Sequence, residues 1–269
     1  MRVLITGISG FVGSHLAEYL NSNLNQPQLY GLIRLRSSLA NLKKISGQVK
    51  CYTADLMEFS SLLSPLDEIR PDLIFHLAGQ TAPSFSWSLP ARTVEVNLVG
   101  TINLLEAIKE LRLNPRVVIA GAGEAYGLSS ADELPMKENS QFRPLSPFGV
   151  SKAAQDLLGF QYFKSHNLRI VRARLFSTIG PRQPEYYFIS SLAKQIAEIE
   201  KKKKEPIIYA GNLENKRDYT DVRDLVRALW QVAEKGEEGE AYNLGSGQAW
   251  FGNEILKILL GMTRAKIVV

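Results

Sequence analysis

Short apolar runs alternate with stretches of helical period through the first 175 residues of the chain. The run Leu73–Leu77 is apolar at nearly every position, which is typical of a parallel strand covered on both faces. Strands joined by helical crossovers indicate βαβ units, so we predict an α/β fold built on a doubly wound parallel sheet. The predicted strands are Arg2–Thr6, Leu29–Ile33, Val49–Thr53, Leu73–Leu77, Arg116–Ala120 and Arg169–Arg174. The predicted helices between them are His15–Leu24, Leu56–Glu68, Val94–Leu111 and Ser151–Ser165.

The pattern changes after Ser177, where Gly180-Pro181 interrupts the chain. We predict a second, smaller α/β lobe over residues 177–269, which would bind the substrate, after a first domain over residues 1–176. The predicted elements of the lobe are helices Ile189–Lys203, Asp221–Ala233 and Asn253–Leu260, with short strands near Ile207–Ala210 and Ala241–Leu244.

Three glycines, Gly7, Gly10 and Gly13, follow the first predicted strand. At this place Gly7 permits a tight turn, Gly10 lets the backbone approach a pyrophosphate, and Gly13 allows the helix and the strand to pack closely. The first amides of the helix then face the negative charge. The spacing predicts that residues 1–176 form a Rossmann domain that binds a dinucleotide. The candidate contacts in this loop are Gly7, Gly10, Phe11, Val12 and Gly13.

The end of the second predicted strand indicates which dinucleotide is bound. An NAD site places a carboxylate here, but this chain has Arg34, Arg36 and Ser37. Because a guanidinium presents a planar fork to phosphate oxygens, these residues favour the 2′-phosphate of NADP, with NAD as the alternative. After the third strand, Asp55 could accept a hydrogen bond from the adenine amino group or cap the next helix.

Composition and charge exclude several other classes of function. The net charge is +5, but the densest basic run, Lys201–Lys204, is typical of a solvated helix end, so we expect no nucleic-acid partner. No apolar run approaches the ~18 residues of a membrane span, and the chain begins on a core strand, so we expect a cytoplasmic protein with no membrane partner. The single cysteine, Cys51, excludes a disulfide framework, and no histidine has a partner at metal-ligand spacing.

The glycine spacing Gly7-x-x-Gly10-x-x-Gly13 resembles that of the extended short-chain dehydrogenase/reductase superfamily, also called the NAD-dependent epimerase/dehydratase family. Further motifs of the superfamily match in order along the chain: Asp55-Leu56, His76-Leu77-Ala78-Gly79, Asn97, Tyr126-Gly127, Ser146-Pro147-Phe148-Gly149-Val150-Ser151-Lys152, Gly180-Pro181 and Arg217-Asp218. Within the superfamily, Arg34-Leu35-Arg36-Ser37-Ser38 and Gly211-Asn212-Leu213 followed by Lys216-Arg217-Asp218 resemble the GDP-mannose 4,6-dehydratases. Ala193-Lys194-Gln195-Ile196 and Glu205-Pro206-Ile207-Ile208 resemble the GDP-4-keto-6-deoxymannose reductases.

The resemblance implies a partner and further site residues. The partner would be a nucleotide-diphosphate sugar, with GDP as the expected nucleotide. The implied cofactor contacts beyond the glycine and arginine loops are Asp55, Leu56, Leu77, Ala78, Gly79, Asn97 and Lys152. The implied substrate contacts are Ser177, Asn212 and Arg217, although Ser177 stands where the family pattern has asparagine.

The residues that would move protons depart from the family pattern. Related enzymes use a Tyr-x-x-x-Lys pair and a Ser or Thr, in which the lysine lowers the pKa of the phenol so that it can exchange a proton. Here Lys152 and the carboxylate Glu124 are present, but Phe148 occupies the tyrosine position and Ala122 the Ser/Thr position. We therefore expect a nucleotide-sugar dehydratase or reductase whose activity is weak or lost.

Two alternatives remain open from the sequence. The chain could be a non-catalytic dinucleotide-binding or regulatory protein on the same fold. Its end at Val269 also lies before the point where family members end, which reflects either truncation or a naturally small lobe.

The helices predicted over Val94–Leu111 and Ser151–Phe163 carry wide apolar stripes, which include Leu157 and Phe160. In the families that the chain resembles, these helices pair across a two-fold axis, so we expect a homodimer. Alternatively, both stripes cover the parallel sheet.

Overall fold

The computed structural model describes all residues from Met1 to Val269 and divides into two units. The first unit comprises Met1–Phe176 and Val222–Leu244, and the second comprises Ser177–Asp221 and Gly245–Val269. Val222–Leu244 was expected in the smaller lobe, and its place in the first unit is a correction. The physical reason is the apolar face of this segment, which packs into the core of the first unit.

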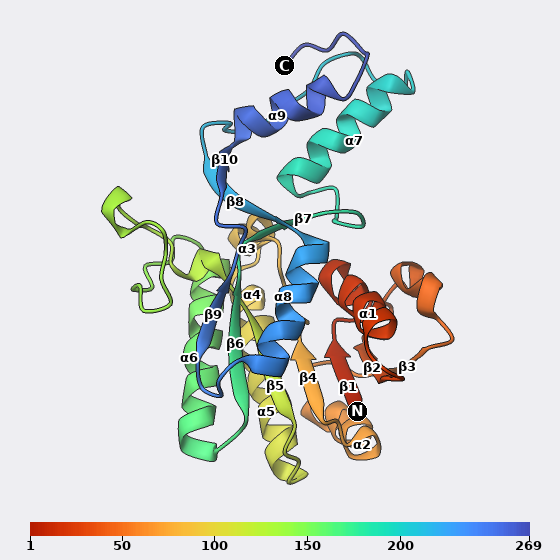
Figure 1. Cartoon of the computed structure of the whole chain (residues 1–269), viewed down its shortest axis with the longest axis vertical. Coiled ribbons are helices and arrows are strands. Elements are labelled where there is room, and N and C mark those ends of the chain that lie inside the picture. Colours follow the sequence, from red (N-terminus) through yellow and green to blue (C-terminus); the bar gives the residue numbers. More distant parts are fainter. The chain divides into compact units, whose positions relative to one another are not determined.

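The first unit is built on a seven-stranded sheet in the order β3-β2-β1-β4-β5-β6-β9 (Figure 1). Every neighbouring pair in this sheet is parallel, which confirms the predicted doubly wound fold. The predicted strand Ala241–Leu244 forms, but it pairs with β6 in this sheet. The strands are β1 Arg2–Thr6, β2 Gln28–Ile33, β3 Val49–Thr53, β4 Leu73–His76, β5 Arg116–Ala122, β6 Ile170–Leu175 and β9 Ala241–Leu244.

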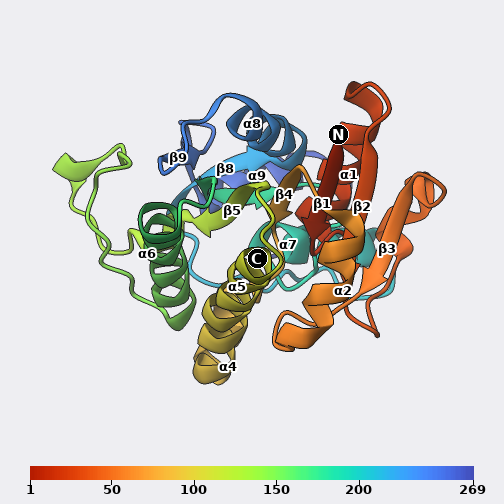
Figure 2. The ribbon, with the colours of Figure 1, turned by 90° about the horizontal axis from the view of Figure 1, so that it is seen from below.

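Helices cover both faces of this sheet (Figure 2). Alternate residues of β1 point to opposite faces, so Val3 and Ile5 pack with α1 and α8, whereas Leu4 packs with α2 and α5. The helices of this unit are α1 Phe11–Asn23, α2 Phe59–Ile69, α3 Pro83–Ser88, α4 Pro90–Val94, α5 Gly100–Glu110, α6 Pro147–His166 and α8 Val222–Lys235. Short 3-10 turns lie at Ala40–Ile45, Gly123–Ala125 and Ala131–Glu133, and a π-helical turn at Glu95–Val99 joins α4 to α5.

The second unit has a three-stranded sheet in the order β10-β8-β7 and two helices. Its small core gathers apolar side chains of both helices around Ile208. Its elements are β7 Ser177–Ile179, α7 Phe188–Glu200, β8 Lys216–Asp221, β10 Ala249–Phe251 and α9 Gly252–Gly261.

The strand predicted near Ile207–Ala210 does not form, so that prediction was wrong. Ile207 makes a single bridge to Val268, and the Gln195 side chain bonds the backbone amide and carbonyl of Tyr209. Because the Gln195 side chain occupies these backbone groups, they cannot form the hydrogen bonds of a β-ladder.

None of the helices combines the length and the apolar character needed to cross a bilayer.

If α8 belongs to the first unit, its buried side chains should stabilise the core of that unit. Leu229 is fully buried in the core shared with α1 and the sheet, so Leu229→Ala is expected to lower the free energy of unfolding by about 2–5 kcal/mol. Gln231→Ala, at an exposed position of the same helix, is the control and is expected to change it by less than about 0.5 kcal/mol. Denaturant unfolding measures both, and an equal effect of the two substitutions would contradict the assignment.

Candidate functional site

The glycine turn lies between β1 and α1, and its backbone tolerates no side chain at two positions. Gly7 has a φ of +72°, and a Cβ there would lie 2.9 Å from the backbone of Ala78. A Cβ on Gly13 would lie 2.3 Å from the Gly7 carbonyl oxygen. Helix α1 begins at Phe11, and no side chain caps its first amides. These amides are therefore available to an anion, as the glycine spacing predicted.

The basic loop predicted to read the ribose follows β2 directly. Arg34 and Arg36 are exposed, and the Arg34 amide donates to Ser37 Oγ at 3.0 Å, which closes a turn. Asn41 donates to the Ser9 carbonyl at 3.0 Å and so ties the segment after this loop to the glycine turn. The two predicted phosphate-binding segments are thus adjacent.

Asp55 accepts a hydrogen bond from the Met57 amide at 3.0 Å, within the turn that precedes α2. The alternative that Asp55 caps this helix is wrong, because the turn delays the start of α2 to Phe59 and leaves Glu58 at the cap. The adenine contact of Asp55 stays a prediction. Leu56 accepts through its carbonyl from Asn103 at 2.7 Å and packs on Gly100.

Asn97 organises the loop that follows β4, which includes the predicted contacts Leu77, Ala78 and Gly79. Its Oδ1 accepts from the Gln80 amide at 2.8 Å. Its Nδ2 donates to the Gln80 carbonyl at 3.0 Å and to Ser151 Oγ at 2.9 Å. The side chain is fully buried in the π-helical turn, a rare geometry that occurs often at functional sites. Its amide therefore fixes the shape of the loop beside the glycine turn, and a direct cofactor contact stays a prediction.

Lys152 is buried on α6, and its ammonium lies against the end of β5. Nζ donates to the Ala120 carbonyl and to Gln155 Oε1, both at 2.8 Å. Burial lowers the pKa of Lys152 to about 8, and the nearby Glu124 carboxylate opposes this shift. The ammonium is thus held by two oxygen atoms in an interior position.

The residues at the predicted proton-transfer positions gather around Lys152. The Phe148 ring is buried with its centroid 6.0 Å from Nζ, and Ala122 is buried at the end of β5. A Cβ on Gly149 would lie 2.6 Å from the Glu124 carbonyl oxygen, so the turn that carries Glu124 packs closely on the start of α6. The structure therefore brings Ala122, Glu124, Phe148 and Lys152 to one place.

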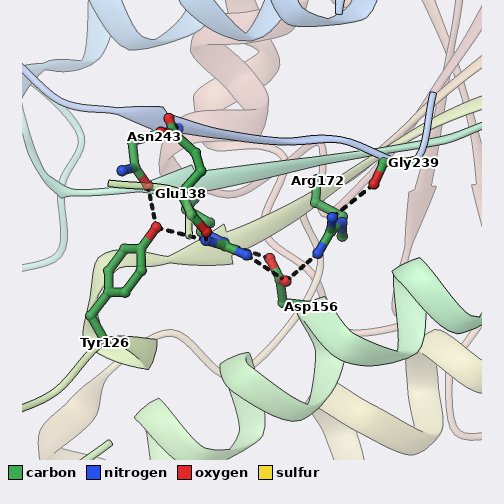
Figure 3. A network of polar contacts seen from close by, with 7 residues as sticks. Tyr126, Glu138, Asp156, Arg172, Gly239 and Asn243 are labelled. Atoms are coloured by element: carbon green, nitrogen blue, oxygen red, sulfur yellow. Dashed lines mark hydrogen bonds and ion pairs between the residues drawn. The ribbon is translucent and has the colours of Figure 1, made fainter. Parts of the chain in front are cut away.

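Tyr126 is held in a buried network (Figure 3). Its hydroxyl donates to Asn243 Oδ1 at 2.7 Å and accepts from Arg174 Nη1 at 2.7 Å. Burial raises the pKa of the phenol, which keeps it protonated. Both hydrogen-bonding roles of this hydroxyl are thus directed to the protein interior, as expected for a structural aromatic residue.

Motif reasoning missed the ion-pair network that surrounds Tyr126. Asp156 accepts from Arg172 at 2.6 Å and from Arg174 at 2.8 and 2.9 Å (Figure 3). A signal was present in the sequence, because Arg172 and Arg174 interrupt an apolar strand at alternate positions. Charged residues in a buried strand need a partner, although the sequence does not show where that partner lies.

The predicted substrate residues Ser177, Asn212 and Arg217 belong to the second unit. Ser177 begins β7, Arg217 lies in β8, and Asn212 accepts from the Glu214 amide at 2.9 Å in the loop before it. Their contact with a substrate stays a prediction. The neighbouring Asp218 accepts hydrogen bonds from the Ser246 hydroxyl at 2.6 Å and the Gly247 amide at 2.8 Å, and so fixes a turn of the same unit.

Comparison with known proteins agrees with the geometry. The profile of the family "GDP-mannose 4,6 dehydratase" matches residues 4–268. GDP-6-deoxy-D-mannose reductase of Pseudomonas aeruginosa is 32% identical over 266 residues, which cover 99% of this chain and 81% of the reductase. GDP-mannose 4,6 dehydratase of Drosophila melanogaster is 31% identical over 258 residues, which cover 91% of this chain and 64% of the dehydratase.

Solved structures give the same result for the fold. The structure of RMD from Pseudomonas aeruginosa in complex with NADPH superposes with a TM-score of 0.87 at 32% identity, covering 99% of this chain and 85% of that one. UDP-glucose 4-epimerase of Thermotoga maritima gives a TM-score of 0.86 at 26% identity, covering 100% of this chain and 85% of that one. The predicted resemblance is thereby confirmed: the chain belongs to the GDP-mannose 4,6 dehydratase family, a GDP-mannose branch of the NAD(P)-binding nucleotide-sugar dehydratases and reductases.

Proposed function

We propose that this chain binds NADP(H), or alternatively NAD(H), together with a GDP-linked sugar, and that it catalyses sugar dehydration or keto reduction weakly or not at all. The observation that carries the proposal is a complete glycine turn in the same unit as two buried apolar side chains, Phe148 and Ala122, at the positions predicted for the phenol and the hydroxyl. The names of the relatives, which are GDP-sugar reductases and dehydratases, support the substrate class.

The residues of the first unit fit a nicotinamide dinucleotide. The glycine turn excludes a Cβ where a pyrophosphate would lie, and Arg34 and Arg36 present exposed guanidinium groups to a 2′-phosphate. Lys152 would donate to the ribose on the nicotinamide side. When bound, the dinucleotide supplies hydride exchange with a sugar carbon. The solved neighbour that holds NADPH supports the same assignment.

The chain's own groups limit the chemistry. Phe148 has no proton to give to a sugar oxygen, and Ala122 has no hydroxyl to hold that oxygen. Loss of a positioned acid or base typically costs about 10²–10⁴ in rate. Glu124 remains near Lys152 and can remove a proton from a sugar carbon. The site therefore keeps a carboxylate base. It has no hydroxyl group to hydrogen-bond the sugar oxygen and no phenol to protonate it.

A second candidate function is non-catalytic binding, in which the dinucleotide is a structural or regulatory ligand. It is favoured by the loss of two proton-handling groups at once, since both positions are now apolar and buried. Retention of the Glu124 carboxylate near Lys152 favours descent from an enzyme, because dinucleotide binding alone makes no use of that carboxylate.

Restoring both lost groups tests the enzyme proposal. Phe148→Tyr combined with Ala122→Thr is expected to raise turnover of GDP-mannose, or of its 4-keto-6-deoxy derivative with NADPH, by about 10²–10⁴-fold. Product chromatography and NADPH absorbance measure the gain. Phe59→Tyr, at an exposed position in α2, is the control and is expected to leave turnover unchanged. If the restored protein binds NADPH but no sugar nucleotide, the enzyme proposal is wrong.

The basic loop gives a test of the cofactor. Replacing Arg34 and Arg36 together by Ala is expected to raise the Kd for NADPH by about 10- to 100-fold, because charge-assisted hydrogen bonds to the 2′-phosphate are lost. The Kd for NADH is expected to stay the same, and Lys43→Ala, an exposed charge in the same region, is the control. Fluorescence titration gives all these values. Equal weakening of both dinucleotides would argue against 2′-phosphate recognition.

We also propose a homodimer formed through α5 and α6. The inner face of α6 covers the sheet with residues such as Tyr162, but Val150, Leu157 and Phe160 remain 47%, 59% and 41% exposed. Val150 and Leu157 are two helical turns apart and so share one face. Covering the sheet accounts for the inner residues and leaves this outer stripe to a second copy of the chain.

The dimer is tested by mass in solution. Light scattering is expected to give twice the chain mass of 30.0 kDa for the native protein and a single chain for Leu157→Glu. Lys235→Glu, at an exposed position of α8, which packs on the other face of the sheet, is expected to leave the dimer intact. A native protein that stays at 30.0 kDa at micromolar concentration would disprove the dimer.

A further inference from the structure

A chain of buried hydrogen bonds runs from the glycine turn to Lys152. It passes through side chains of β1, β4, α5 and α6 that are each 5% exposed or less. Polar side chains in such a position are stabilising only when every donor and acceptor is matched. The members are Thr6, His76, Thr101, Gln155 and Lys152.

The Thr101 hydroxyl fixes the direction of every bond in this chain. It donates its one hydrogen to the Asn97 carbonyl at 2.6 Å. Its two lone pairs then accept from Gln155 Nε2 at 2.7 Å and from His76 Nε2 at 2.9 Å. The hydroxyl is saturated, so both neighbouring side chains must be donors toward it.

The direction at Thr101 assigns the tautomer of His76. Because Nε2 carries the hydrogen, Nδ1 must accept, and its partner is the Thr6 hydroxyl at 2.9 Å. Thr6 in turn accepts from the Ala78 amide at 3.1 Å. Burial, together with the smaller effect of the nearby Lys152 charge, lowers the pKa of His76 to about 3, so the ring is neutral. Each polar atom along this stretch is therefore matched with a single orientation.

The same direction fixes the amide of Gln155. Its nitrogen faces Thr101, so its oxygen must face Lys152, where it accepts from Nζ at 2.8 Å. The second acceptor for Nζ is the Ala120 carbonyl at 2.8 Å. An ammonium has three hydrogens, so two are directed by the protein and the third can be given to a ligand. The charged or titratable groups facing Nζ are Glu124 and the neutral His76.

We propose that Gln155 is a positioning residue: oriented by Thr101 and His76, it holds the Lys152 ammonium so that its third hydrogen points to the nicotinamide half of the bound dinucleotide. The proposal rests on the dinucleotide site proposed above. It also joins the two ends of that site, because the chain ends at Thr6 and Ala78, where the glycine turn closes on the loop after β4.

Two ligands separate positioning of Lys152 from general support of the fold. NADPH has both halves of the dinucleotide, whereas adenosine 2′,5′-bisphosphate has only the adenine end. Gln155→Met removes the amide and is expected to raise the Kd for NADPH about tenfold while the Kd for the bisphosphate changes less than about twofold. Gln161→Met, an exposed glutamine on the same helix, is the matched control and is expected to change neither value.

Two further variants keep the test decisive. Gln155→Glu retains an acceptor for Lys152 but no longer donates to Thr101, so it is expected to weaken NADPH binding by a smaller factor than Gln155→Met. Thr101→Val releases the Gln155 amide without touching Lys152 and is expected to weaken NADPH binding selectively, by a smaller factor than Gln155→Met. It serves as the test if Gln155→Met does not fold. Calorimetric titration gives each Kd, and thermal unfolding shows whether each variant is folded.

The outcomes distinguish this inference from the proposed function. If the native protein binds neither ligand, the dinucleotide site itself is wrong. If the native protein binds both, but Gln155→Met and Thr101→Val weaken both ligands equally or neither, the positioning role alone is overturned. Loss of NADPH binding in Gln155→Glu equal to that in Gln155→Met would also overturn it, because the acceptor for Lys152 would then be irrelevant.

Discussion

The carboxylate of Asp156 accepts hydrogen bonds from two buried guanidinium groups, those of Arg172 and Arg174. This interaction fixes α6 against β6, and Lys152 lies one helical turn earlier on the same helix. Two cations face one anion here, so backbone carbonyls complete the coordination: Glu138 bonds Arg174 and Gly239 bonds Arg172. Removing one partner of a buried ion pair typically costs about 3–5 kcal/mol, because a charge is left unmatched in the interior. The position of Lys152 depends on this carboxylate.

Helix α6 thus carries two polar systems on adjacent turns. One, centred on Asp156, connects the helix to β6 and β9, the last two strands in the order of the sheet. The other, centred on Gln155, ties it to α5 and to the ends of β1 and β4. Both systems are independent of the groups at positions 122 and 148. The hydrogen bonds that hold Lys152 therefore do not depend on which side chains stand at those two positions.

The fold could be predicted well where buried strands produce apolar runs, and less well elsewhere. The six strands of the first 176 residues were found because both faces of the sheet are covered. Strand β8, with the sequence Lys216-Arg217-Asp218-Tyr219-Thr220-Asp221, was missed because its polar side chains show no strand pattern. Val222–Leu244 was assigned to the wrong unit because periodicity reveals that a helix has an apolar face but not which core receives it.

The residues of the site could be predicted where their role depends on nearby sequence, and not where it depends on partners that are distant in sequence. The glycines, Lys152 and Phe148 are recognised from spacing along the chain, since each depends on one turn or one helix. Asp55 was ambiguous because a one-turn delay in the start of α2 decides its role. The partners of Lys152, His76 and Arg174 could not be predicted, because hydrogen-bond partners from 25 to 70 residues away depend on the register between elements.

The chain passes between its two units three times, after Phe176, after Asp221 and after Leu244. The larger unit is therefore not a segment that can be expressed by stopping synthesis early, since a product ending at Phe176 would lack α8 and the edge strand β9. Exchange of the smaller unit between relatives must likewise replace residues 177–221 and 245–269 together, as a two-part graft. A single crossover would pair half of one small core with half of another.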